Sequence, residues 1–512
     1  MRTNKILTGG ILLLLLGYYA LFLAHPINLV TADLGRHLKN GEELLKSHHL
    51  VENNFYSYTY PDFPTTNHHW GSGALFYLVW KAAGFAGLQA FFIALSLASF
   101  GLFFWLAKKY GGILTATLLS LIAIPLLSER TEVRPEVLTY LFSGLFLWIL
   151  YKFRDNQLSA RWLWVLPVIE VLWVNSHIYF FMGFAITGAF MLEALLLRHR
   201  EQLRKLSIIF IALAAATLVN PFFLKGAVAP FAIFQNYGYR LVENSSVWFL
   251  EKIIYIPNIL IFKILFSILI LSFALVLLKN RKNLSLVNLF LAAGVSIMGW
   301  FMLRNFVLFA LFALPIASMN FAPRLTSPTS LPLVGRVREG GGKKEWLALG
   351  LTALVFFLAL SGELRAIFPT LPSHYSLGLD PETAKAAEFF ESKNISGPIF
   401  NNYDIGGYLI FYLYPRNQVF VDNRPEAYPA DFFQNTYIPI QEDDTRWHEE
   451  ARKNGFNAIF FSHRDVTPWG QTFLKNRLED PDWAVAYLDE YSIIFVGRDS
   501  VNSGIIESKT NK

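Results

Sequence analysis

Ionisable and amide side chains stand at the ends of the apolar segments of this chain, in short stretches that lie far apart in the sequence. Polar groups beside membrane-embedded helices are costly and are therefore often functional, although each one alone is also explained as a solvated loop end. Taken together, they predict a functional polar cavity at one face of a membrane. The candidate residues are Asp33, His37, His68, His69, Arg134, Glu136, Asn175, His177, Glu243, Arg304 and Asn305.

Asp33 and His37 follow the first apolar segment and are four residues apart. On a helix over residues 32–46 their side chains share one face, whereas Leu34, Leu38 and Leu45 would point toward lipid. A carboxylate at the start of a helix is also explained by the helix dipole, which favours negative charge there. The dipole accounts for Asp33 but leaves His37 without a role, so we interpret the pair as part of a functional site.

Histidines gather between residues 25 and 69, which raises the question of metal binding. The pairs His48-His49 and His68-His69 are adjacent in sequence, whereas two metal ligands on one helix face need a spacing of four residues. The sequence therefore predicts no metal site from these histidines.

The elements that carry these residues are membrane helices. Of the 512 residues, 54% are hydrophobic and only 16% are charged, and the mean hydropathy of +0.38 is too high for an ordinary soluble domain. The net charge of +6 comes from Lys and Arg between apolar runs, as in cytoplasmic loops, which excludes a nucleic-acid-binding protein. The absence of Cys excludes disulfides and thiolate chemistry.

A spanning helix needs about 20 apolar residues, and about eleven segments meet or approach this length. We interpret the first as an uncleaved helix, because no small-residue cleavage site follows its long apolar run. The segment 70–84 is interpreted as an interfacial helix. Counting it as a span would reverse the side of every later loop and would place the loops rich in Lys and Arg outside. The predicted spans are 6–24, 88–107, 113–127, 136–151, 162–174, 178–197, 206–219, 262–278, 285–303, 305–320 and 345–361.

This topology predicts a multi-pass protein of the cytoplasmic membrane with its N-terminus inside. Residues 1–361 form the transmembrane module, in which 25–86 is a large first outer loop. Within the same module, residues 321–344 form a basic, Pro- and Gly-rich cytoplasmic linker. Residues 362–512 then lie outside, on the same side as the first loop.

The C-terminal part has the composition of a soluble α/β domain. A helix-like stretch, PETAKAAEFFES, begins after the N-cap candidate Asp380 and alternates with the strand-like stretches GPIFNN, QVFVD, NAIFFS, WAVAYL and SIIFVG. Asp404, Asp422 and Arg424 follow these elements, where α/β folds carry binding groups, but a structural salt bridge between Asp422 and Arg424 explains them equally well. The predicted fold class is a polytopic α-helical membrane protein with a C-terminal extracytoplasmic α/β domain.

A series of short motifs runs through nearly the whole chain in a specific order. The first loop contains Asp33, His37-Leu38 and Gly41, then NNFYSYT and NHHW, and RPEVLTYL, WVNSH, NP, RNFVLFALFALP, NNYDIGGYL and VFVDNRPEAY follow. This order resembles a prokaryotic branch of the GT-C glycosyltransferase superfamily, related to the mannosyl- and aminoarabinosyltransferases. The chain departs from that branch at His69, where the family usually has glutamate, and at Gly35-Arg36, where two tryptophans are frequent.

The resemblance implies an inverting glycosyltransferase that moves a sugar from a polyprenyl-phosphate donor to an acceptor hydroxyl at the outer face of the membrane. Asp33 would accept the proton of the acceptor hydroxyl. Arg134 and Arg304 would stabilise the leaving phosphate, and His37 and His68 would contact the donor. Interfacial snorkelling is the alternative explanation for each arginine.

The same resemblance implies the partners of the chain. These are a polyprenyl-phosphate-linked sugar, membrane lipid, and an acceptor that is a glycan, a lipid or a protein. A divalent metal stays open, because some members of the superfamily use one and others do not.

Two other functions fit a polytopic chain, namely a transporter or flippase and a non-catalytic binder of lipid-linked sugars. A transporter is expected to show repeat symmetry and charges within its spans. Here the polar groups lie at one face, and a large first loop with a soluble outer domain favours an enzyme.

Overall fold

The computed structural model describes residues 2–30, 32–232, 237–239, 241–280, 284–322 and 342–506. Most of the predicted linker at 321–344 lies outside these residues. The chain divides into two compact units, which we describe separately. Unit 1 consists of Met1–His25, Ala90–Pro230 and Leu241–Ser376, and unit 2 consists of Pro26–Gln89, Phe231–Arg240 and Leu377–Lys512. The sequence-based boundary at 361–362 stays a prediction.

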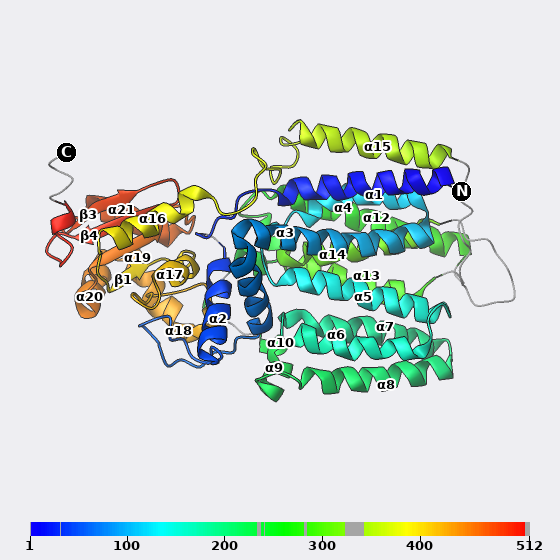
Figure 1. The fold of residues 1–512 in the computed structure, drawn as a ribbon, viewed down its shortest axis with the longest axis horizontal. Helices are drawn as coiled ribbons and strands as arrows, with labels where there is room; N and C mark the ends of the chain where they lie inside the picture. Colours follow the sequence, from blue (N-terminus) through cyan, green and yellow to red (C-terminus); the bar gives the residue numbers. More distant parts are fainter. Residues whose placement is uncertain are drawn as a thin grey trace. The chain divides into compact units, whose positions relative to one another are not determined.

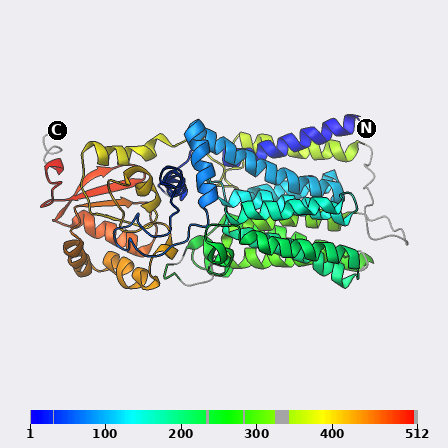
Figure 2. The same ribbon diagram turned by 60° about the horizontal axis from the view of Figure 1, so that its bottom comes forward.

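Unit 1 is a bundle of long apolar helices that lie side by side in both ribbon views (Figures 1 and 2). Each segment predicted to span the membrane lies, to within two residues at its ends, inside one of these helices, in some cases together with an adjoining 3₁₀-helix. The elements are α1 (Arg2–Leu23), the second part of α3 (Trp70–Gly111), α4 (Ile113–Leu127), α5 (Glu136–Arg154), η1 (Ala160–Trp164), α6 (Val165–Val174), η2 (Ile178–Phe180), α7 (Phe181–Leu196), α8 (Arg200–Thr217), α9 (Phe223–Ala227), α10 (Ala229–Ala232), η3 (Val242–Asn244), α11 (Val247–Leu250), α12 (Pro257–Asn280), α13 (Leu286–Phe301), η5 (Leu303–Asn305), α14 (Phe306–Phe321) and α15 (Lys343–Leu360).

The composition of these helices is that of a polytopic membrane protein. Within the described residues, six helical stretches are long and apolar enough to cross a membrane, and α4 and α13 are shorter apolar helices. Large apolar side chains stay exposed on the bundle, for example Leu13 at 71% and Leu278 at 81%. Such exposure is unfavourable in water and favourable against lipid.

The helix α3 consists of two helices that meet at Gly84. This residue has φ +65° and ψ −170°, which interrupts the helical geometry and which glycine adopts without steric cost. The break coincides with the predicted end of the helix at 70–84. Its place at the membrane interface stays a prediction.

Unit 2 is an α/β domain, as the sequence predicted for the C-terminal part, and it also includes the residues of the predicted first loop. Its elements are α2 (Leu34–Ser47), the first part of α3, α16 (Pro381–Ser392), β1 (Ile399–Asn401), α17 (Gly406–Leu413), η6 (Pro425–Ala427), α18 (Ala430–Phe432), the π-helix η7 (Phe433–Tyr437), α19 (Ile438–Glu442), α20 (Asp444–Asn454), β2 (Ala458–Ser462), α21 (Pro468–Glu479), β3 (Trp483–Leu488) and β4 (Ser492–Gly497).

A four-stranded sheet in the order β1-β2-β4-β3 forms the core of unit 2. The strand β1 pairs in parallel with β2, with Phe400 opposite Ile459. The pairs β2–β4 and β3–β4 are antiparallel, and Phe460 lies opposite Ile494. Every residue of β2 and β4 is buried, as expected for continuous apolar strands in the middle of a sheet.

The stretch QVFVD was predicted as a strand, and this prediction is wrong. Its backbone makes only an isolated bridge, between Val419 and Ser57. The side chain of Asn401 takes the place of a neighbouring strand, because its Oδ1 accepts from the Phe420 N–H at 2.9 Å and its Nδ2 donates to the Val421 carbonyl at 2.7 Å. The backbone groups are therefore satisfied without a ladder.

The helix α2 packs closely against two neighbours in unit 2. A Cβ atom on Gly41 would lie 2.3 Å from the Gly73 carbonyl oxygen, and one on Gly35 would lie 2.7 Å from the Gly407 carbonyl oxygen. Leu34, Leu38 and Leu45 were expected to face lipid. Leu34 and Leu38 are buried, so the expectation is wrong for these two, whereas Leu45 is exposed. Glycine at the two contacts lets α3 and α17 approach α2 and cover Leu34 and Leu38.

The predicted topology can be tested by labelling, because the chain has no Cys. We expect Asp62→Cys and Glu449→Cys, both exposed positions of unit 2, to react with an impermeant maleimide in intact cells. The exposed Ser159→Cys, in a loop that the sequence places inside, serves as the control and should react only after permeabilisation. Labelling of position 159 in intact cells, or protection of 62 or 449, would contradict the topology.

Candidate functional site

The predicted site residues fall into two clusters, one in each unit. In unit 1 the arginine cluster consists of Arg130, Arg134, Arg304, Glu136 and Glu243. In unit 2 the Asp33 cluster consists of Asp33, Arg36, Asn423 and the histidines His37, His68 and His69.

Short loops at the ends of helices position the arginine cluster. Arg130 and Arg134 lie between α4 and α5, and Glu136 is the first residue of α5, where a carboxylate favours the helix dipole. Glu243 lies in η3 and Arg304 in η5, the short 3₁₀-helix between α13 and α14. Residues far apart in sequence thus meet because helix ends come together.

The two carboxylates of the cluster bridge the three guanidinium groups. Arg130 Nη1 lies 2.7 Å and Arg134 Nη1 3.3 Å from Glu243 Oε2. Arg304 Nη2 lies 3.1 Å from Glu136 Oε1, and its Nη1 lies 3.7 Å from Glu243 Oε1. Although burial favours the neutral acid, Arg130, Arg304 and Arg134 hold the pKa of Glu243 far below its usual range, so this carboxylate is ionised.

Three guanidinium groups share Glu136 and Glu243, and with Glu132 they face three carboxylates, so the cluster is balanced in formal charge. Glu132, at 2.9 Å from Arg134 Nη2, adds a peripheral carboxylate that is 37% exposed. Nε and Nη2 of Arg130 and Nε of Arg304 are buried and make no hydrogen bond with any residue that the structure describes. Arg130 Nε lies 3.5 Å from Glu136 Oε2, an ion-pair distance without a hydrogen bond. Buried donors that make no hydrogen bond are costly, and an anion with several oxygens would satisfy them.

The other candidates of unit 1 make hydrogen bonds that stabilise the bundle. His177 Nδ1 lies 2.8 Å from Thr139 Oγ1, and Asn175 Nδ2 donates to the Val171 carbonyl at 2.7 Å. Asn305 Nδ2 donates to the Met298 carbonyl at 3.0 Å. These contacts favour a structural role for all three residues.

His177 nevertheless connects to the arginine cluster through one ring. The ring of Tyr179 lies 5.0 Å from that of His177 and 5.8 Å from the guanidinium carbon of Arg304. This distance allows a cation–π contact between Arg304 and Tyr179.

In unit 2, Asn423 connects Asp33 to Arg36. The Asn423 Nδ2 donates to Asp33 Oδ1, and Arg36 Nε donates to Asn423 Oδ1 at 2.9 Å. Asp33 is the N-cap residue of α2, but its side chain makes no capping hydrogen bond. Its carboxylate is therefore oriented by Asn423 and does not cap the helix.

Three histidine rings lie next to one another in unit 2. The centroids of His37 and His69 are 5.4 Å apart, and those of His69 and His68 are 4.3 Å apart. His68 Nδ1 lies 3.1 Å from the Thr66 carbonyl oxygen. In the part of the chain that the structure describes, no three or more His, Cys, Asp or Glu side chains are arranged to hold a metal ion.

Arg130 and Asn423 were not among the predicted site residues. Arg130 lies in the same loop as Arg134, so its charge beside an apolar segment was a signal in the sequence. The motif RPEVLTYL, however, contains only Arg134. Asn423 contacts Asp33 across 390 positions of sequence, and no local pattern indicates this. The predicted salt bridge between Asp422 and Arg424 is confirmed, with Nη2 and Oδ2 2.6 Å apart.

Asp404 is a further residue with unusual chemistry. Burial, together with the neighbouring carboxylates of Asp465 and Asp33, raises the pKa of Asp404 to about 7. An ordinary aspartate has a pKa of about 3.9. Between about pH 4 and pH 7 the folded chain therefore keeps a proton on Asp404 that the unfolded chain has lost. The raised pKa of Asp404 therefore lowers the free energy of unfolding as the pH rises from about 4 to about 7, and it causes no further change above pH 7.

We expect Asp404→Asn to remove this pH dependence. The difference in Tm between Asp404→Asn and the unchanged chain should grow from pH 5 to pH 7 and level off above about pH 8. Asp431→Asn, an exposed position of the same unit, serves as the control. A difference in Tm that does not vary with pH would contradict the raised pKa.

No family model and no curated protein sequence matches the chain, but solved structures do. The archaeal oligosaccharyltransferase AglB of Archaeoglobus fulgidus, in complex with an inhibitory peptide and a dolichol-phosphate, superposes with a TM-score of 0.59 at 12% identity, over 90% of this chain and 69% of that one. The same enzyme tethered to an acceptor peptide containing the NVT sequon gives a TM-score of 0.61 at 12% identity and the same coverage.

A second solved structure matches nearly from end to end. ArnT of Cupriavidus metallidurans in the apo state gives a TM-score of 0.54 at 15% identity, over 97% of this chain and 98% of that one. At such identities the likeness concerns the fold, and both neighbours are GT-C glycosyltransferases. The chain therefore has the GT-C fold that the motifs in its sequence predicted.

Proposed function

We propose that the chain is an inverting glycosyltransferase that moves a sugar from a polyprenyl-phosphate donor to an acceptor hydroxyl at the outer face of the cytoplasmic membrane. The observation that carries the proposal is the arginine cluster, in which Arg130 and Arg304 keep buried N–H groups that make no hydrogen bond with any residue that the structure describes. The GT-C fold supports it, because the AglB structure was solved with a dolichol-phosphate.

The phosphate of the donor provides what the arginine cluster lacks. Its oxygens would accept hydrogen bonds from the guanidinium groups of Arg130, Arg134 and Arg304. Negative charge on the phosphate grows as the bond to the sugar breaks, so positioned guanidinium groups stabilise the transition state more than the ground state.

Asp33 would serve as the general base. In a single displacement, the acceptor oxygen forms a bond to the anomeric carbon, the bond from that carbon to the phosphate oxygen breaks, and the polyprenyl phosphate leaves with the electron pair. The hydroxyl proton passes to the Asp33 carboxylate. One displacement inverts the anomeric configuration. Asn423 orients Asp33, and we place His37 and His68 at the donor.

A catalytic divalent metal ion stays open. The described residues offer no set of three carboxylate or imidazole ligands, and His69 occupies the position where related chains have glutamate. We therefore derive no step through a metal. Glu136, Glu243, Asn175, His177 and Asn305 keep the supporting roles that their contacts indicate.

The test is to incubate the purified chain in nanodiscs with a panel of polyprenyl-phosphate sugars and with glycan, lipid and peptide acceptors. We expect polyprenyl phosphate to be released and the product to show the opposite anomeric configuration by NMR. Binding of the donor without release would indicate a non-catalytic binder. Movement of an intact donor between leaflets would indicate a flippase.

A further inference from the structure

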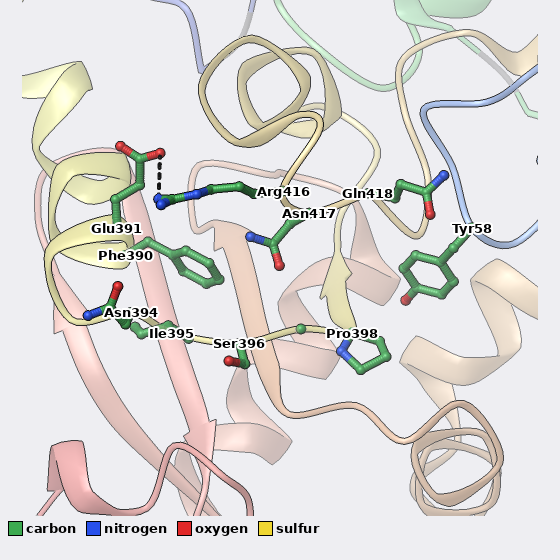
Figure 3. A pocket seen from close by; sticks show the side chains of 11 residues that line it. Tyr58, Phe390, Glu391, Asn394, Ile395, Ser396, Pro398, Arg416, Asn417 and Gln418 are labelled. Atoms are coloured by element: carbon green, nitrogen blue, oxygen red, sulfur yellow. Dashed lines mark ion pairs between the residues drawn. The ribbon is translucent and has the colours of Figure 1, made fainter.

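Unit 2 contains a hollow of about 630 Å³ between the turn after α16 and the turn after α17. We call it the amide pocket, because Asn394, Asn417 and Gln418 line it together with Ser396 and Tyr58. In Figure 3 the segment 394–398 forms one side and 416–418 the other, with Tyr58 at one end and the ion pair Glu391–Arg416 at the other. The proposed transfer reaction uses none of these residues.

Hydrogen bonds from two asparagines, Asn457 and Asn502, hold one wall of the amide pocket in place. The Ser396 N–H donates to Asn502 Oδ1 at 2.9 Å, and Asn502 Nδ2 donates back to the Ser396 carbonyl at 2.9 Å. Asn457 Nδ2 donates to the Gly397 carbonyl at 2.7 Å. The wall is thus formed before any ligand arrives, which reduces the entropy cost of binding.

The opposite wall is held in the same way. Gln418 Nε2 donates to the Phe55 carbonyl at 2.8 Å, and the Tyr58 hydroxyl donates to the Ile399 carbonyl at 2.8 Å. The ring of Tyr58 is therefore fixed at the end of the pocket. It offers a flat apolar surface of the kind that a ligand can pack against.

Three polar side chains of the pocket have hydrogen-bonding capacity that the fold does not use. The side chains of Asn394, Ser396 and Asn417 make no hydrogen bond with any residue that the structure describes. Each amide offers two donors and one acceptor oxygen, and the hydroxyl offers both functions. A ligand that donates and accepts at closely spaced positions would match them.

The charge and the buried apolar residues of the pocket narrow the class of ligand. Glu391 and Arg416 are 4.0 Å apart, largely exposed and of opposite sign, so the pocket has no excess charge that would select a phosphate or a carboxylate. Phe390 and Ile395 line the hollow but are nearly fully buried, so its accessible apolar surface is limited to the Tyr58 ring and Pro398. A ligand that carries neutral hydroxyl groups is the class that matches the amide and hydroxyl side chains of the pocket.

We propose that the amide pocket binds a neutral saccharide chain. Gln418 of the pocket and Asn423, the partner of Asp33, are separated by five positions, a distance of at most about 18 Å in an extended chain. A saccharide in the pocket would lie on the same unit as the proposed catalytic base and close enough for an oligomeric glycan to reach both. Binding itself does not depend on the proposed transfer reaction.

The experiment measures binding of short linear neutral oligosaccharides, composed of glucose, mannose or N-acetylglucosamine, to the full-length chain in nanodiscs. Saturation-transfer NMR detects contact and titration calorimetry gives Kd. We expect one of these saccharides to bind, and Asn417→Leu and Asn394→Leu each to weaken binding about tenfold, or about 1.4 kcal/mol. Neither amide bonds to the protein, so Asn417→Leu should leave Tm unchanged. Asn394→Leu should lower Tm, because Asn394 has φ +50°, a left-handed conformation that leucine adopts only at a cost.

Two controls separate this inference from other causes. Asn435→Leu and Asp431→Asn, both at exposed positions elsewhere in unit 2, should bind the saccharide like the unchanged chain. The proposal is wrong when no saccharide of the panel binds, or when the leucine variants bind as tightly as the unchanged chain. Binding of a Ser- and Thr-rich peptide in place of saccharides, with loss in Asn417→Leu, would also overturn it.

Discussion

Asp33→Asn is expected to lower turnover by roughly 100-fold or more while folding and donor binding are preserved. Asparagine keeps the size of the side chain and an oxygen that accepts from the Asn423 amide, so the local geometry survives. It cannot take a proton from the acceptor hydroxyl. Turnover and thermal stability should be measured on the same preparation.

The helix-dipole explanation of Asp33 predicts the opposite pattern. The variant would lose roughly 0.3–1 kcal/mol of stability and keep its turnover per folded molecule. Asp62→Asn, an exposed aspartate of unit 2, is the matched control and should change neither quantity. His37→Ala should reduce turnover less than Asp33→Asn. A fully active, slightly destabilised Asp33→Asn would end the catalytic assignment.

Elements defined by local sequence were predicted well, for physical reasons that act locally. The membrane helices follow from the length of apolar runs, because a bilayer requires internally bonded segments of a set length. The helix α16 coincides with PETAKAAEFFES, because Asp380 Oδ1 accepts from the Glu382 N–H at 3.0 Å and Pro381 suits the first helical turn.

Predictions that depended on distant partners were less successful. QVFVD has the composition of a strand, but the side chain of Asn401 satisfies its backbone. Leu34 and Leu38 have the spacing of a lipid-facing stripe, but α17, more than 360 positions later, covers α2. Composition and periodicity describe which side chains are apolar, and they do not specify what covers them.

In the candidate site, too, the residues could be predicted from local sequence, whereas their contacts depend on distant parts of the chain. Arg134, Arg304, Glu136 and Glu243 were recognised because each is a polar residue beside an apolar segment, and the structure brings these four together. Their pairing was not visible in the sequence, and neither was the role of Arg130, which contacts both carboxylates. Asn423 was inside a recognised motif, yet its contact with Asp33 required the fold.

Arg304→Ala is expected to lower kcat/KM by roughly 100- to 1000-fold, the effect of removing one donor that stabilises developing negative charge. Arg304→Lys should lower it less, because the charge survives whereas the planar, bidentate geometry does not. The same order is expected for Ala and Lys at Arg134. The exposed Arg161→Ala is the matched control and should leave kcat/KM unchanged.

Stability must be separated from catalysis here, because Arg304 also contacts Glu136 at 3.1 Å and Asn244 at 2.9 Å. Removing one partner of a buried ion pair costs roughly 3–5 kcal/mol, so the alanine variant is expected to have a lower Tm. Direct binding of polyprenyl phosphate to folded protein gives a readout independent of turnover. A role in phosphate binding predicts weaker binding in Arg304→Ala than in Arg304→Lys. When the folded lysine and alanine variants at 134 and 304 all bind polyprenyl phosphate and turn over like the unchanged chain, the arginines are interfacial anchors, and the arginine cluster does not hold the leaving group.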